Sequence, residues 1–79
     1  MKEVFVKLNG MEDVKEFNAV VFGIDGDIDL ISGRYVVDAK SIMGIFSLDI
    51  SKVIVCRINA ASTAEEEKAV ENISKWVKR

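Results

Sequence analysis

Polar and hydrophobic residues alternate over residues 2–8, which is the period of a β-strand with one buried face. Apolar residues then recur at helical spacing and predict a helix that begins at Gly10 or Met11 and ends at Phe22. Its buried stripe consists of Val14, Phe17, Val21 and Ile24. The chain therefore opens with a strand followed by an amphipathic helix.

Both ends of this helix carry local signals. Asn9 can accept a backbone hydrogen bond at the N-terminus, and Glu12 three residues later completes a capping box. Gly23 is placed to end the helix, because glycine readily adopts the left-handed conformation that follows many helices. We expect the chain to turn directly afterwards.

The middle of the chain predicts a hairpin and a short helix. Residues 27–31 and 34–38 are rich in β-forming side chains, and Ser32-Gly33 between them suits a tight turn. Ser41 can cap a second helix that runs through Leu48. The two strands are expected to pair in antiparallel fashion.

Residues 52–58 alternate again and are rich in β-branched side chains, so they predict a fourth strand. Ser62 and Glu65 have the spacing of a capping box before a last helix. Its expected buried stripe consists of Ala69, Val70, Ile73, Trp76 and Val77. The order is β-α-β-β-α-β-α, an α+β fold in which three helices most simply cover one face of a four-stranded antiparallel sheet. We expect one domain over residues 1–79.

Composition narrows the function classes. The net charge is −2 and no Lys/Arg-rich run occurs, so nucleic-acid binding is disfavoured. A signal-peptide pattern and a membrane-spanning apolar run are both absent, which favours a cytoplasmic protein without membrane association. We interpret Cys56, the only cysteine, as a core residue. Because the sequence contains no histidine and no Cys/His pair, we expect no metal, no cofactor and no enzymatic activity.

The segment after Ser41 has more apolar residues than one buried face requires. Ile45 and Leu48 can face the core, which leaves Ile42, Met43 and Phe46 on other sides of the helix. Two interpretations are open: a helix sunk deep in the core, or an exposed surface that binds a protein partner. Gly44 lowers helix stability by about 1 kcal/mol relative to alanine, so it indicates a close approach of a neighbouring backbone or of a partner.

Ser41 itself has two possible roles. It can serve only as the N-cap of the helix, which is common for serine. It can also accept a phosphate, because the start of a helix offers unpaired amides and the positive end of the helix dipole. The chemistry of the residue alone does not decide between them.

The segment Asp38-Ala39-Lys40-Ser41-Ile42-Met43-Gly44-Ile45-Phe46-Ser47-Leu48 closely resembles the regulatory-serine segment of HPr, the histidine-containing phosphocarrier of bacterial sugar phosphotransferase systems. The order of elements is also similar to that of the HPr fold. The resemblance implies that Ser41 is the serine modified by an HPr serine kinase. It also implies that Ile42, Met43 and Phe46 contact protein partners, such as phosphotransferase-system proteins, the kinase or a transcription regulator.

The second HPr motif, Gly-Leu-His-Ala-Arg-Pro-Ala, aligns with residues 10–16, where only the glycine is retained and Met11 replaces leucine. Glu12 then occupies the position of the active-site histidine, and the arginine has no counterpart. We therefore expect an HPr-like regulatory or adaptor domain without phosphohistidine transfer. The alternatives are a phosphocarrier that uses a non-histidine site, in which Glu12 would form an acyl phosphate, and an α+β module that binds a small ligand.

Overall fold

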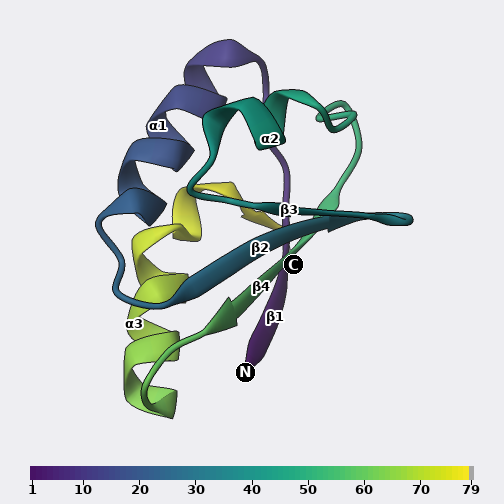
Figure 1. Cartoon of the computed structure of the whole chain (residues 1–79). Helices are drawn as coiled ribbons and strands as arrows, with labels where there is room; N and C mark the ends of the chain where they lie inside the picture. Colours follow the sequence, from purple (N-terminus) through teal and green to yellow (C-terminus); the bar gives the residue numbers. More distant parts are fainter. Residues whose placement is uncertain (79) are drawn as a thin grey trace.

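A computed structural model describes residues 1–78, and its elements follow the predicted order with one addition at the end. The elements are β1 (Lys2–Val6), α1 (Met11–Phe22), β2 (Asp27–Ser32), β3 (Tyr35–Asp38), α2 (Ile42–Phe46), β4 (Ile54–Asn59), α3 (Thr63–Asn72), the 3₁₀ turn η1 (Ser74–Trp76) and β5 (Val77–Lys78). Figure 1 shows the helices gathered to one side of the strands. In these residues the predicted α+β class is confirmed.

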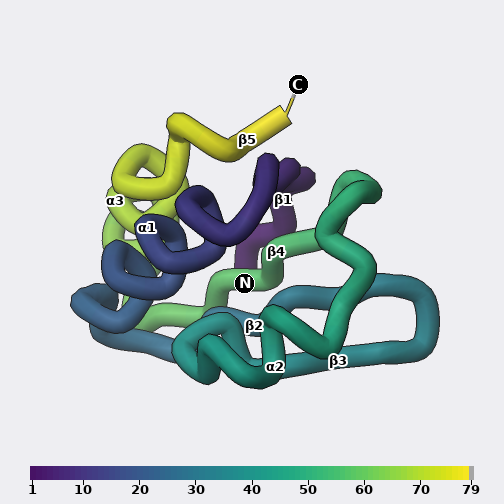
Figure 2. The backbone as a smooth tube through the Cα atoms, turned by 90° about the horizontal axis from the view of Figure 1, so that it is seen from above, coloured from purple at the N-terminus to yellow at the C-terminus, as the bar shows by residue number. Residues whose placement is uncertain are grey.

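The strands form one antiparallel sheet in the order β3-β2-β4-β1-β5. Alternate residues of its central strand β4, namely Ile54, Cys56 and Ile58, are buried under the helices. In the view turned by 90°, α1 and α3 lie side by side over part of the sheet, and α2 lies near β2 and β3 (Figure 2). The core therefore sits between one face of the sheet and the three helices. Within residues 1–78, no helix combines the length and hydrophobicity needed to cross a membrane.

The body of α1 matches the prediction, but its ends do not. Val14, Phe17 and Val21 are fully buried. The predicted capping box is wrong: Gly10 occupies the N-cap position with φ 91°, and the Asp13 carboxylate accepts the backbone N–H of Asn9 at 2.8 Å. The left-handed φ at Gly10 explains why a residue without a side chain stands at the cap.

Several other boundaries differ from the predicted ones. Gly23, expected to be left-handed, has φ −84° and simply continues the last turn of α1. The hairpin turn is Gly33-Arg34 rather than Ser32-Gly33, because the φ of 59° at Gly33 requires the glycine at the first turn position. Helix α2 ends at Phe46, two residues before Leu48, which is nevertheless buried.

The end of the chain departs most from the prediction. Helix α3 stops at Asn72, and the chain turns through η1 so that Trp76 packs edge-on against Phe17, with ring centroids 5.4 Å apart. Residues 77 and 78 then pair with β1 as a fifth strand, where four were expected. Of the predicted helical stripe, Ala69, Ile73 and Trp76 are buried, whereas Val70 and Val77 are only partly buried.

The start of α3 is held to the N-terminus. Ser62 caps the helix as predicted, because its Oγ accepts the N–H of Glu65 at 3.2 Å. The neighbouring Glu66 is buried, and its carboxylate accepts the N–H of Ala60 at 3.1 Å and pairs with the amino group of Met1 at 2.9 Å. These contacts lower the pKa of Glu66, with the hydrogen bond from the amino terminus as the largest cause.

Candidate functional site

The turn that precedes α2 is fixed by contacts from β2 and α1. Ala39 is fully buried, and its N–H donates to the carbonyl of Ile28 at 2.8 Å. Asn18 of α1 donates its side-chain amide to the carbonyl of Ala39 at 3.1 Å. The Lys40 ammonium donates to the carbonyl of Ile24, just after α1, at 2.7 Å. Contacts with β2, with α1 and with the segment just after α1 therefore determine where α2 begins.

Ser41 follows this turn as the N-cap of α2. Its backbone is extended, with φ −96° and ψ 108°, and its Oγ accepts the N–H of Gly44 at 3.3 Å. Its carbonyl accepts the N–H of Ile45 at 3.1 Å, which closes the first helical turn. The predicted capping role of Ser41 is confirmed. The residue is also exposed, so its hydroxyl is open to solvent.

Helix α2 has one buried side and one exposed side. Ile45 is fully buried, whereas Met43 is 75% exposed and Phe46 is 41% exposed. The interpretation of a helix sunk in the core is therefore wrong. Ile42, which was grouped with the exposed residues, is partly buried and packs against the core. We call Met43 and Phe46, together with the accessible part of Ile42, the α2 patch.

Gly44 lies where α2 approaches β3 most closely. A Cβ atom built on it would lie 3.2 Å from the Cβ of Val37 and 3.6 Å from the carbonyl oxygen of Asp38. A spacing of 3.2 Å is tighter than most real contacts of this kind. The close neighbour expected at this glycine is therefore strand β3. Glycine allows this approach, although it lowers the intrinsic stability of the helix.

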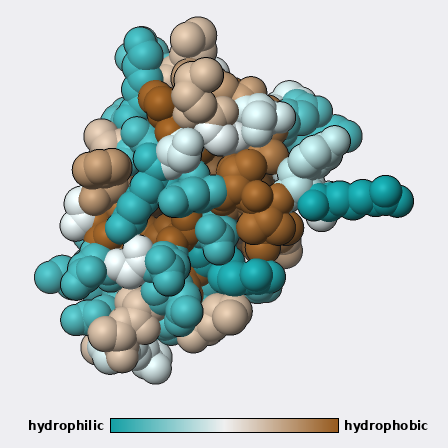
Figure 3. Space-filling view, viewed as in Figure 1, coloured by the Kyte–Doolittle hydropathy of each residue, from teal (hydrophilic) through white to brown (hydrophobic). Residues whose placement is uncertain are grey.

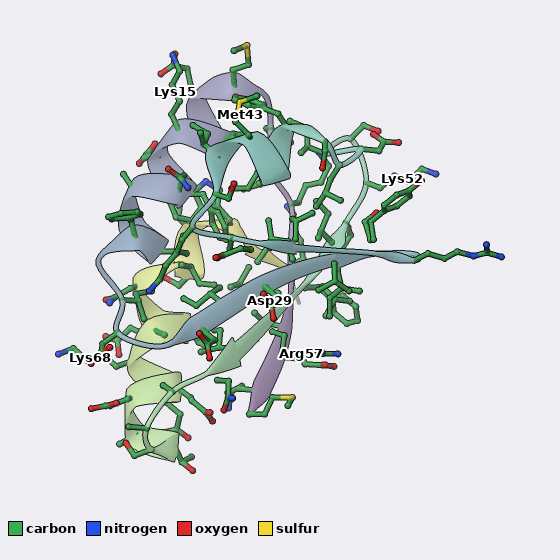
Figure 4. The ribbon with its side chains drawn as sticks, in the orientation of Figure 1. Lys15, Asp29, Met43, Lys52, Arg57 and Lys68 are labelled. Atoms are coloured by element: carbon green, nitrogen blue, oxygen red, sulfur yellow. The ribbon has the colours of Figure 1, made fainter. Side chains whose placement is uncertain are left out.

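Glu12 lies in the first turn of α1 and is exposed. The hydrogen bond from the Asn9 N–H that was predicted for Glu12 goes to the Asp13 carboxylate instead. The Glu12 carboxylate therefore does not cap α1 through this bond. Helices α1 and α2 are in contact, and Figure 4 shows Lys15 of α1 and Met43 of α2 at the same end of the molecule. The start of α1 and the α2 patch thus belong to one end of the structure.

Cys56 is a core residue, as predicted. It is fully buried in β4, and this burial, followed by the charge of Asp29, raises the pKa of its thiol to about 12. A thiol in that state is protonated at neutral pH and is not a nucleophile. Within residues 1–78, no group of three Cys, Asp or Glu side chains is arranged to hold a metal ion.

Comparison with known proteins gives two matches and one negative result. Residues 13–79 match the family model described as the PTS HPr component phosphorylation site, and this match begins directly after Glu12. The crystal structure of HPr-C-His from Thermoanaerobacter tengcongensis is similar to this chain at 27% identity and a TM-score of 0.80. The similarity covers 95% of this chain and 89% of that one. No curated protein matches the sequence.

Proposed function

The chain belongs to the HPr family of the phosphotransferase system, and we propose that within this family it is a regulatory or adaptor protein rather than a phosphohistidine carrier. The observation that carries the proposal is chemical. The 79 residues contain no histidine, and phosphohistidine transfer requires an imidazole nitrogen to take up the phosphoryl group and release it. Its activity would then lie in contacts with other proteins, in the cytoplasm, and not in catalysis.

Regulation would act through Ser41. Its hydroxyl is exposed, and the N–H of Gly44 lies 3.3 Å from Oγ, so a phosphate oxygen could accept the same amide. A phosphate would add a charge of about −1.5 to −2 at neutral pH next to the apolar α2 patch. Phosphorylation of Ser41 would therefore change which partners can bind there.

The partner surface would be the α2 patch. Met43 and Phe46 expose flexible or aromatic apolar groups one helical turn apart, and such groups are common at protein interfaces. The family membership favours phosphotransferase-system proteins, an HPr serine kinase or a transcription regulator as partners.

Phosphorylation is tested by mass spectrometry after incubation with ATP and a purified HPr serine kinase. We expect one phosphate on the native chain and on Ser47→Ala, and none on Ser41→Ala. Ser47 is a matched control because it is an exposed serine at the other end of the same helix. An unmodified native chain, or modification that survives in Ser41→Ala, would contradict the regulatory site.

Partner binding is tested with the same kinase by titration calorimetry. We expect Met43→Glu and Phe46→Glu each to weaken binding at least about tenfold, since a charge placed in an apolar contact is costly. Phe22→Glu serves as the control, because Phe22 is 70% exposed at the far end of α1. Equal affinities in all three variants would show that the α2 patch is not the binding surface.

A carrier role through Glu12 is the second candidate, since the resemblance of residues 10–16 to the family's histidine motif would put this exposed carboxylate at the position of the histidine. It is tested with labelled phosphoenolpyruvate and the first enzyme of the phosphotransferase system. Transfer of label to the native chain but not to Glu12→Gln would support an acyl phosphate and would overturn the adaptor proposal. The absence of label on both would remove this candidate.

A further inference from the structure

One face of the sheet is covered by helices, and the other, which we call the open face, is not. In β4 the buried residues Ile54, Cys56 and Ile58 alternate with Val55 and Arg57, which are only half-buried. Since successive side chains of a strand point to opposite faces, Val55 and Arg57 belong to the open face. Strand register then assigns the neighbouring residues of the other strands to the same face.

A line of apolar residues crosses the open face at right angles to the strands. It runs through four strands in the order β1, β4, β2 and β3, because each member pairs with the next. The line consists of Phe5, Val55, Ile31 and Val36. Its two end members, Phe5 and Val36, are each 57% exposed. Figure 3 shows hydrophobic atoms gathered beside the β2–β3 hairpin, where part of this line lies. We call these four residues the apolar row.

Charges of opposite sign lie on the two sides of the apolar row. Two residues along each strand from the apolar row, a second row crosses the sheet and contains three carboxylates and one guanidinium. Its members, in register with one another, are Glu3, Arg57, Asp29 and Asp38. Two residues away in the other direction are Lys7 on the chain after β1 and Arg34 in the hairpin turn. Figure 4 shows Asp29 and Arg57 well away from the tip of that hairpin. The open face is therefore acidic on one side of the row and basic on the other.

We propose that the open face binds a second copy of this chain, with the two sheets stacked around a two-fold axis that runs along the apolar row. This axis places each residue of the row against its own equivalent. It also places the acidic side of one copy against the basic side of the other, so that Glu3 faces Lys7 and Asp38 faces Arg34 of the second copy. A two-fold axis along the strands would instead place acidic side against acidic side, and like charges in an interface are unfavourable. The distribution of charge selects the first arrangement.

The area of the face sets the strength of this contact. Four strands about 4.8 Å apart, each contributing about five residues of about 3.3 Å, give a footprint of roughly 300 Å² for each copy. The two copies together would bury roughly 600 Å², about half the area of a small specific interface, so we expect only a weak, transient dimer with a Kd of about 100 μM. The Lys7 ammonium already donates to the carbonyls of Leu8 and Ile50, so Asp38 and Arg34 are the better pair to vary.

The dimer is tested by sedimentation velocity at concentrations from about 10 μM to about 1 mM, which bracket the expected Kd. We expect the sedimentation coefficient of the native chain to rise with concentration. Val36→Lys should weaken the dimer at least about tenfold, because it places a charge in the apolar row. Met43→Lys, on the opposite side of the molecule, should leave the dimer unchanged. A native chain that stays monomeric at about 1 mM would overturn the proposal, even if another protein binds this face.

A charge exchange tests the arrangement itself. Arg34→Glu and Asp38→Lys should each weaken the dimer, and the double variant should recover most of the native affinity because the facing charges are again opposite. Urea unfolding of each variant shows that it folds, which matters because the Asp38 carboxylate also accepts the N–H of Lys40 at 2.9 Å. If the double variant loses as much dimer affinity as the two single variants together, the proposed axis is excluded.

Discussion

Replacing Ile45 with alanine should destabilise the whole domain and not only helix α2. The side chain is fully buried, and it is the residue of α2 that reaches the core most completely. Removing such a side chain in favour of alanine costs about 2–5 kcal/mol, part of it for the cavity that remains. A chain of this length is stable by roughly 4–12 kcal/mol, so the loss is a large share of the total.

The matched variant is Met43→Ala on the same helix. Met43 is 75% exposed and alanine is at least as good a helix former, so its free energy of unfolding should change by less than about 0.5 kcal/mol. The two variants alter opposite sides of the same helix. Their difference therefore measures how firmly the core positions the α2 patch.

Urea unfolding followed by tryptophan fluorescence provides the assay. Trp76, the only tryptophan, is 4% exposed and packs edge-on against Phe17, so its emission reports on the core. With a slope m of about 1 kcal/mol per M, the midpoint for Ile45→Ala should fall by about 2 M or more. The midpoint for Met43→Ala should stay within about 0.5 M of the native value. Equal shifts in the two variants would refute the assignment of a buried and an exposed side to α2.

Three further predictions concern other parts of the fold. The pKa of Glu66 is lowered from its ordinary value of 4.5. The ionised carboxylate therefore stabilises the fold above about pH 4.5, and this stability is lost as the pH falls through the folded-state pKa. Glu66→Gln should flatten the acid side of a plot of Tm against pH. Gly26→Ala should cost about 1–3 kcal/mol in urea unfolding, because φ is 143° and a Cβ would lie 2.9 Å from a backbone oxygen. Gly33→Ala, at φ 59° with open space around it, should cost less, and the reverse order would contradict this reasoning. Cys56 should react with a thiol reagent far more slowly in the native state than in urea, and rapid native labelling would show that β4 opens easily.

Much of the candidate site could be predicted from sequence because its signals are local. The cap formed by Ser41 depends on residues three positions apart, and the exposure of Met43 and Phe46 follows from helical spacing around Ile45. The partial burial of Ile42 could not be predicted in this way. It depends on how closely the helix lies against the sheet, which is a property of the packed structure.

The hydrogen bonds that position the site could not be predicted from the sequence pattern either. Asn18 and Lys40 hold the turn before α2 by hydrogen bonds to carbonyls 21 and 16 positions away. Neither residue carries a local signal for such a contact, because any backbone carbonyl can accept it. The predicted cap of α1 was wrong for a different reason. The pattern assigned the carboxylate that accepts the Asn9 N–H to Glu12, whereas in the structure it is Asp13, one residue later.

The sequence by itself determined the number and type of the main elements, the buried stripe of α1, the cap of α2 and the impossibility of a phosphohistidine, because each depends on residue identity or on neighbours within one or two turns. Only the tertiary structure decided the fifth strand, the strand order and the apolar row on the open face. These features depend on which distant segments pair and in which register. Phe5, Ile31, Val36 and Val55 become neighbours solely through that pairing, although up to 50 positions separate them along the chain.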